Sequence, residues 1–559
     1  MWGSKRGRGV RVWALQFSLF ALSLMTAFTG NAAAADPPRA QKQPEKSGEL
    51  RPRITVSEKT THILQPLDAD GYVDYLAALN QMTSQGVTPE NNAGVLFVRA
   101  LGLNGFQPAY RARVFKLLQI EPFSEQGEYL TEFDEFVMKK RGRPPTKQEQ
   151  ADFDTAMQEP WSGSEFPLVA EWLTSNAKPI DLIIQGTRRP RCYFPMVESG
   201  HSGLVALPML TVQMTRNAAR ALAARAMLRL GEGRIGEAEQ DLLACHRLAR
   251  LVGSAPFDIA AFLVVAIDSI ACQGDARLME QAHLSAEGAL AYQRELRQLP
   301  SLPVMADVID GSDRFVFLDT LLMFARGKRA DFEKLIGSSA DIQNLFQTEG
   351  APRVPRVAKA IVAELHSNPS LLDWDAVLQF GNEQFDKADT AARKATVPER
   401  KKAIEAFERE LRAMRSGLTD LGASGTPSSA GRSLPNPLGR EIGIVLTALF
   451  MPPVSTACEA ENRARTRYAL GQLGFALSAY RADHAAYPES LDVLAPKYIA
   501  QVPTDLYTEQ PLRFKRQGDG FLLYSVGPNS TDDGGRTPGS QPPGDDIVLQ
   551  IPHKNAKKK

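Results

Sequence analysis

Residues 473–535 read LGFALSAYRADHAAYPESLDVLAPKYIAQVPTDLYTEQPLRFKRQGDGFLLYSVGPNSTDDGG, and the order of segments in this stretch decides how the last part of the chain folds. Around its start, Leu470, Leu473 and Leu477 recur at spacings of three and four residues, which is typical of the buried face of an amphipathic helix. Tyr487-Pro488 ends this helix, because the residue before a proline disfavours the helical conformation.

Beyond that helix, the sequence predicts a second short helix and a small antiparallel sheet. The short helix is expected from Glu489 to Tyr498, and a strand from Leu512 to Phe514 follows it. Gly518-Asp-Gly520 is typical of a tight hairpin turn, from which Phe521 to Ser525 returns as the second strand. A last strand is expected at Ile547 to Leu549. We therefore expect a small α+β domain, with one long helix on a short antiparallel sheet.

The whole chain has 559 residues, which is too long for one hydrophobic core and predicts two or three domains. Apolar residues make up 43% and charged residues 23%, an ordinary balance for a globular protein. The 65 lysines and arginines nearly match the 64 acidic residues, so the formal net charge is only +1. This balance argues against a nucleic-acid partner, because nucleic-acid binding normally leaves a basic footprint.

The N-terminus has the pattern of an export signal. An apolar run from Val12 to Phe28 follows four cations and precedes a small-residue segment that ends at Ala35; the cations are Lys5, Arg6, Arg8 and Arg11. We expect cleavage after Ala35 and a periplasmic or extracellular location for the remainder. The alternative is an uncleaved anchor, since about 17 apolar residues can just span a bilayer. The membrane would then be contacted only through this segment.

The composition of the sequence divides the whole chain into six parts. The predicted parts are an export signal at 1–35, a disordered tether at 36–54, an α-helical domain at 55–415 with a possible division near 190–205, a Gly-, Ser- and Pro-rich linker at 416–437, a small α+β domain at 438–551 and a basic tail at 552–559. The tail is interpreted as solvated, because blocks of like charge usually stay disordered.

A helical hairpin is predicted in the middle of the chain. One apolar stripe runs from Ala219 to Leu230, Gly231-Glu-Gly233 interrupts it, and a second stripe runs from Ala238 to Val252. The small residues at these spacings resemble one tetratricopeptide hairpin, in which two helices approach closely. The sequence contains no convincing second copy, so an isolated hairpin within a mainly α-helical domain is the interpretation.

The segment Ile259 to Cys272 is almost entirely apolar and is expected to be the central helix of the helical domain. Asp268 lies within it, and a buried carboxylate needs a partner. Arg247 or Arg250 of the preceding helix can supply one, and an active-site acid is the alternative. Cys245 and Cys272 lie on these two helices, either as two buried thiols or as one disulfide.

Gly200-His201-Ser202-Gly203-Leu204 begins like the nucleophile elbow of serine hydrolases. Leu204 stands where the motif requires its last glycine, and no strand clearly precedes the segment. Ser202 is therefore interpreted as the cap of the following helix. The alternative is a catalytic serine in a secreted hydrolase.

Three segments together carry a family resemblance: ALSAYRADHAAYP, then SLDVLAPKYIAQVPTDLYTEQPLRF, then GFLLYSVGPNSTDDGG with GDDIVL. In this order they resemble the globular domain of the major pseudopilins of type II secretion, over about 100 of the 559 residues. The resemblance implies a helix packed on a small antiparallel sheet. Pseudopilins begin with a processed membrane-spanning helix, whereas the corresponding helix here is internal. We therefore expect a reused globular module rather than a subunit of a fibre.

The resemblance also implies a calcium-binding loop after the second strand. The matching positions here are Ser525, Asn529, Asp532, Asp533, Asp545 and Asp546. Calcium takes six to eight oxygen ligands, which four carboxylates, an amide and backbone carbonyls of a bent loop can supply. The other interpretation is a solvated loop whose aspartates cap turns.

These observations favour a non-enzymatic, exported cell-envelope protein of interaction or structural type. Its partner would be a protein of the cell envelope, and its C-terminal module would bind calcium. Two alternatives remain: a secreted hydrolase using Ser202 or an acid site around Asp268, and a component of a type II secretion pseudopilus.

Overall fold

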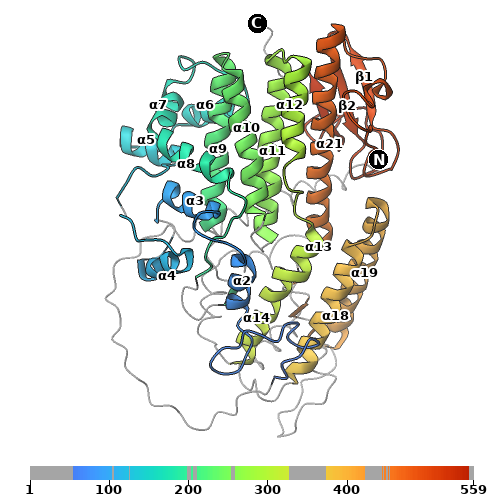
Figure 1. Ribbon diagram of the computed structural model, residues 1–559. Coiled ribbons are helices and arrows are strands. Elements are labelled where there is room, and N and C mark those ends of the chain that lie inside the picture. Colours follow the sequence, from blue (N-terminus) through green and yellow to red (C-terminus); the bar gives the residue numbers. More distant parts are fainter. Residues whose placement is uncertain are drawn as a thin grey trace.

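The computed structural model describes residues 54–552 apart from 104–105, 107, 125, 198–202, 205–209, 254–257, 327–372, 422–442, 445, 448–450 and 452. The described chain is mainly helical, with one three-stranded antiparallel sheet near its C-terminal end (Figure 1). This confirms the predicted combination of many helices with one small sheet. The predicted signal, Ser202 and residues 553–559 of the basic tail lie outside the described residues, as does nearly all of the predicted tether.

Seven short helices form the first part of the described chain. They are α2 (Tyr75–Ser84), α3 (Ala93–Leu101), α4 (Pro108–Leu118), α5 (Phe133–Arg141), α6 (Lys147–Ala156), α7 (Pro167–Ser175) and α8 (Ala177–Thr187). Their ends follow local sequence signals: Thr146 and Glu149 form a capping box at the start of α6, and left-handed Gly142 ends α5. Helices α5 to α8 lie on one side of the molecule, next to α9 (Figure 1).

Four helices make the centre of the molecule. They are α9 (Leu210–Gly231), α10 (Ile235–Val252), α11 (Asp258–Gln281) and α12 (Ala286–Arg297). Helices α9 and α10 form the predicted hairpin. Gly233, at φ +75°, adopts the left-handed conformation that the tight connection requires, and a Cβ at Gly231 would collide with the backbone of Trp161. The predicted central helix is confirmed as part of α11.

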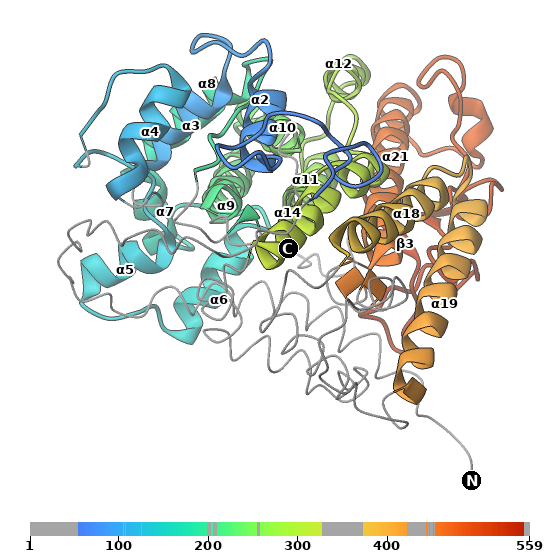
Figure 2. The same ribbon diagram turned by 90° about the horizontal axis from the view of Figure 1, so that it is seen from below.

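A second group of helices lies below the central helices in the view of Figure 1. It comprises α13 (Met305–Val308), the π-helical turn η2 (Ile309–Asp313), α14 (Arg314–Ala325), α18 (Trp374–Ala392) and α19 (Val397–Leu421). These helices share a hydrophobic core with α2 and with the start of the C-terminal helix. Seen from below, α19 lies on the opposite side of the molecule from α5 and α6 (Figure 2).

The C-terminal elements follow the predicted order. They are α21 (Val454–His484), a single 3-10 turn η4 (Leu491–Leu494), β1 (Arg513–Gln517), β2 (Gly520–Ser525) and β3 (Ile547–Ile551). β2 is the central strand and pairs antiparallel with both neighbours. The predicted hairpin turn joins β1 to β2, and Leu470, Leu473 and Leu477 are buried. Only the second helix is shorter than expected, being reduced to η4.

Helix α21 lies between the sheet and the central helices. One hydrophobic core contains apolar side chains of α9 to α12, of α21 and of the sheet. At Gly474, a Cβ would come within 2.6 Å of Met279 of α11 and within 2.7 Å of Leu549 of β3. Two parts that the sequence assigned to separate domains therefore share one core.

The predicted division of the chain stays a prediction. Residues 416–421 of the expected linker belong to the end of α19, and residues 422–437 lie outside the described residues. Within the described part of the chain, no helix combines the length and the apolar character that crossing a lipid bilayer requires.

Candidate functional site

A buried polar cluster lies between α10 and α11, in the middle of the shared core. His246 of α10 contacts Asp268 of α11 through Nδ1, at 3.0 Å from Oδ1. Its other ring nitrogen, Nε2, lies 3.0 Å from Oδ2 of Asp275, which follows Asp268 about two helical turns later on the same face of α11. The side chains of His246 and Asp268 are each only 1% exposed, so water does not solvate this pair.

Two further side chains complete the hydrogen bonds of this cluster. Arg250 donates from Nη1 to Asp268 Oδ1 at 2.6 Å and from Nε to the carbonyl of Pro300. The hydroxyl of Tyr292 on α12 donates to Asp275 Oδ1 at 2.7 Å. The prediction that Asp268 pairs with a neighbouring arginine is confirmed for Arg250, while Arg247 pairs with Glu295 instead.

The charges in this cluster control one another's protonation. Burial acts to lower the pKa of His246, but the carboxylates of Asp275 and Asp268 outweigh burial and raise that pKa to about 9. Burial acts to raise the pKa of Asp268, but His246 and Arg250 outweigh it and lower that pKa to about 2. At neutral pH the imidazolium and the carboxylate are therefore both charged, and each is paired.

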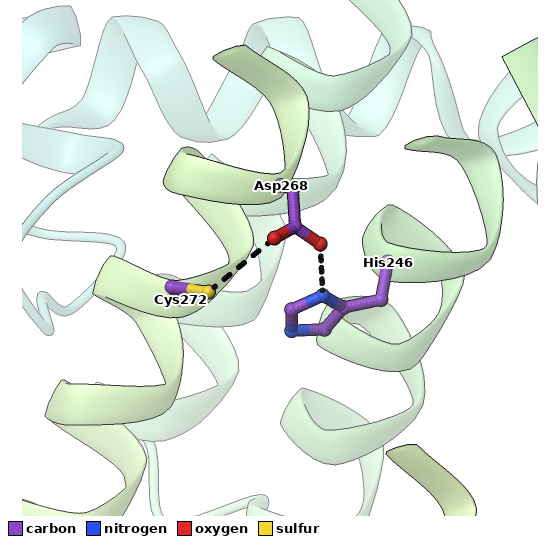
Figure 3. Close-up of side chains that lie close together, drawn as sticks. All are labelled: His246, Asp268 and Cys272. Carbon is purple, nitrogen blue, oxygen red and sulfur yellow. Dashed lines mark hydrogen bonds and ion pairs between the residues drawn. The ribbon is translucent and has the colours of Figure 1, made fainter. Parts of the chain in front are cut away.

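The two nearby cysteines are free thiols, so the alternative of a disulfide is not formed here. Cys272 Sγ lies 3.7 Å from Asp268 Oδ2, and Cys245 Sγ lies 3.9 Å from the carbonyl of Ile267 (Figure 3 shows the first contact). Desolvation raises the pKa of Cys272 well above its usual range; Asp268 and Asp275 add to this effect, whereas Arg250 and Arg467 oppose it. A catalytic cysteine needs a lowered pKa, so the Cys272 thiol is not activated as a nucleophile.

The acidic loop between β2 and β3 is the second candidate site. Carboxylate oxygens of Asp533, Asp545 and Asp546 lie within 4.8 Å of one another. Asp545 and Asp546 directly precede β3, and Asp533 belongs to the turn that follows Asn529. The amide of Asn529 contacts this group, since its Nδ2 donates to Asp533 Oδ2 at 3.1 Å. Three of the six predicted calcium ligands thus converge, and Asn529 lies beside them with its Oδ1 accepting from the amide of Thr531.

The other two predicted ligands have different partners. Ser525 is buried in β2, and its hydroxyl donates to Asp505 at 2.8 Å. Asp532 accepts hydrogen bonds from the hydroxyl of Tyr524 at 2.9 Å and from Nε of Arg513 at 3.1 Å. Neither residue belongs to the group of converging carboxylates.

Backbone amides bind most of the converging carboxylate oxygens. Asp546 accepts from the amides of Gly535 and Asp533, and Asp533 accepts from the amide of Asp545. These bonds from the backbone amide of Asp545 and from the amide of Asn529 lower the pKa of Asp533. Oδ1 of Asp545 differs, because it is buried and has no hydrogen-bond partner. Burial raises the pKa of Asp545.

The sequence contained a signal for the buried cluster that the sequence analysis did not use. Asp268, Cys272 and Asp275 are spaced by four and three residues, which places all three on one face of α11. A polar face within an otherwise apolar helix needs polar partners, and His246 and Tyr292 provide them. Their involvement depends on contacts between helices, which the spacing within one helix does not specify.

Comparison with known proteins yields no match: no family model matches the chain, and no curated protein or solved structure matches it. The two clusters themselves are therefore the features of this protein that indicate a function.

Proposed function

We propose that this protein is a non-enzymatic, exported cell-envelope protein whose C-terminal module binds calcium and serves interaction with a protein partner. The single observation that carries the proposal is the convergence of Asp533, Asp545 and Asp546 in one loop. The export signal and the pseudopilin-like order of segments support the location and the module, as expectations from sequence.

The side chains of the loop are of the chemical types that bind calcium. Calcium prefers carboxylate, amide and backbone carbonyl oxygens on a bent chain, and three carboxylates lie within reach of one ion. The partnerless oxygen of Asp545 supplies one ligand without breaking any hydrogen bond. The carboxylate of Asp533 would exchange some of its amide contacts for the ion, which limits the affinity.

The position of the loop connects it to the helical part. Nζ of Lys401 on α19 donates to the carbonyl of Pro528 at 2.9 Å. Arg463 of α21 and Lys401 also act electrostatically on Asp545. A calcium ion here would offset two of the three negative charges and fix the loop against α19 and α21, giving a partner a rigid surface.

Thermal unfolding of the full chain in calcium and in chelator tests this function. A ligand that binds only the folded state raises its stability, so about 1 mM calcium should raise Tm. Asp533→Asn should remove most of this rise. Asp519→Asn should retain it, because Asp519 is an exposed carboxylate in the β1–β2 turn, outside the converging group. An equal Tm in calcium and in chelator would refute the proposal.

Neither alternative gains a specific observation from the described residues. Arg250 and His246 both bind Oδ1 of Asp268, and they lower the pKa of this carboxyl group to about 2, so at neutral pH it has no proton to donate as a catalytic acid. The helix that corresponds to the pseudopilin helix is internal, and it packs against α11, α12 and α19 rather than standing free.

A further inference from the structure

The buried cluster contains three groups that bind transition metals. Asp268 and Cys272 extend from successive turns of α11, and His246 faces them from α10 (Figure 3). A ring nitrogen of His246, a carboxylate oxygen of Asp268 and Sγ of Cys272 all lie within 4.8 Å of one another. Imidazole, thiolate and carboxylate are the ligand types that zinc accepts.

The side chains are close enough to be compared with the ligands of a tetrahedral zinc site. Bonds of about 2.0 Å to nitrogen and oxygen and about 2.3 Å to sulfur place nitrogen and oxygen roughly 3.3 Å apart, and sulfur and oxygen roughly 3.5 Å apart. Here His246 Nδ1 lies 3.0 Å from one oxygen of Asp268, Oδ1, and Cys272 Sγ lies 3.7 Å from the other oxygen, Oδ2. The carboxylate of Asp268 would rotate or bind through both oxygens, so that the nitrogen, the sulfur and the carboxylate face one ion.

The groups around the three ligands have the arrangement that supports a metal. A zinc-bound histidine normally donates its other ring N–H to a carboxylate, which fixes the ring orientation. Nε2 of His246 has such a partner in Asp275, which the hydroxyl of Tyr292 holds in turn. Arg250 hydrogen-bonds the ligating carboxylate of Asp268.

The exchange of protons for zinc preserves the charge of the cluster. Because both nitrogens of His246 face carboxylate oxygens, both must donate, so the metal-free imidazole carries a positive charge. This charge and that of Arg250 balance Asp268 and Asp275. One divalent ion would replace the proton on Nδ1 and the proton on the Cys272 thiol, which leaves the net charge of the buried cluster unchanged.

We propose that His246, Asp268 and Cys272 are three ligands of one zinc ion, which ties α10 to α11 inside the core, with a water molecule as the fourth ligand of the tetrahedron. Zinc is favoured over calcium or magnesium because a nitrogen and a sulfur ligand replace oxygen. His246 and Asp268 are almost inaccessible, whereas Cys272 retains partial exposure. The ion therefore enters as the helices pack together, as in other structural zinc sites.

The experiment uses the tag-free full chain, unfolded in denaturant with chelator and refolded with cobalt(II) as a spectroscopic substitute for zinc. Wild type should take up about one cobalt per chain with a tetrahedral visible spectrum and a cobalt–thiolate charge-transfer band, and zinc should displace it. Cys272→Ser should lose the thiolate band. Cys245→Ser should keep it, because that thiol faces the carbonyl of Ile267.

The wild-type protein alone can overturn the proposal, if it refolds to its native circular dichroism spectrum without any thiolate band. A band that persists in Cys272→Ser, or that disappears equally in Cys245→Ser, would also overturn it. Calcium titration of the same samples separates this site from the acidic loop, since zinc bound at Cys272 should leave the calcium response unchanged.

Discussion

Each of the two polar clusters brings together three side chains of types that bind metals, at similar separations. The charges of the two clusters are stabilised in different ways. Between α10 and α11 the charges are out of water, and each has a countercharge or a hydrogen bond from another helix. In the acidic loop the negative groups gather on a partly exposed turn, where backbone amides and the side chain of Arg536 compensate them. Convergence alone therefore does not define a site, because burial decides what each group needs from its neighbours.

The largest effect is expected from removing a charge in the buried cluster. Asp268→Ala would leave Arg250 and His246 without their shared partner, and breaking a buried pair from one side costs about 3–5 kcal/mol. Denaturant unfolding measures this cost. Glu295→Ala is the control, since its exposed pair with Arg247 should contribute no more than about 1 kcal/mol. If both variants lose a similar free energy of unfolding, burial does not make the Asp268 pairs more important than an exposed ion pair.

Alkaline pH should weaken the buried cluster next. The pKa of His246 is raised to about 9 in the folded protein, above its ordinary value of 6.5. Its stabilisation is therefore complete below about pH 6.5 and is lost as pH rises through about 9, by roughly 3 kcal/mol in total.

Unfolding free energies between pH 6 and pH 10, recorded with chelator present, test this expectation. His246→Gln removes the titrating group and should flatten the profile across that range. A wild-type profile that is already flat would show that the imidazole does not gain its proton on folding.

Helix α21 connects the two regions, and one of its glycines tests that connection. A Cβ at Gly474 would press on Met279 of the helical core and on Leu549 of the sheet, so Gly474→Ala should destabilise by about 1–3 kcal/mol. Gly471 lies one turn earlier with no atom within 4 Å of the added Cβ, so Gly471→Ala should stabilise by about 1 kcal/mol. Thermal melts of both variants provide the measurement, and equal shifts would contradict the shared core.

The smallest effect is expected at Asp532, which the sequence grouped with the calcium ligands. Its exposed pair with Arg513 and its bond from Tyr524 should together contribute about 1 kcal/mol or less. Asp532→Ala should therefore change Tm slightly and leave the calcium-dependent rise intact. If the rise disappears, Asp532 turns toward the ion and the loop rearranges on binding.

The sequence was informative where local spacing determines structure. The Leu470, Leu473 and Leu477 stripe gave the buried face of α21, and Gly518-Asp-Gly520 gave the hairpin, because helix periodicity and turn chemistry act over a few residues. Asp268 could be paired with Arg250 for a related reason, since consecutive helices of a hairpin lie side by side.

Contacts between distant segments were beyond such reasoning. His246 and Asp275 became neighbours through the relative rotation of α10 and α11, which their separate stripes leave open. In the acidic loop, the aspartates were predicted as a group, but Asp505 and Arg513 from earlier in the chain bind Ser525 and Asp532. The packing of α21 between sheet and helices likewise depends on residues far away in sequence.

This sandwiched position of α21 has a consequence for how the chain is made. Gln293 of α12 donates to the carbonyl of Gln472, which lies 179 residues later. At about 5–20 residues per second, a ribosome would need roughly ten to forty seconds to deliver that partner. Throughout this interval the sides of α11 and α12 that pack against α21 would be uncovered, so the nascent chain would need a chaperone until α21 emerges.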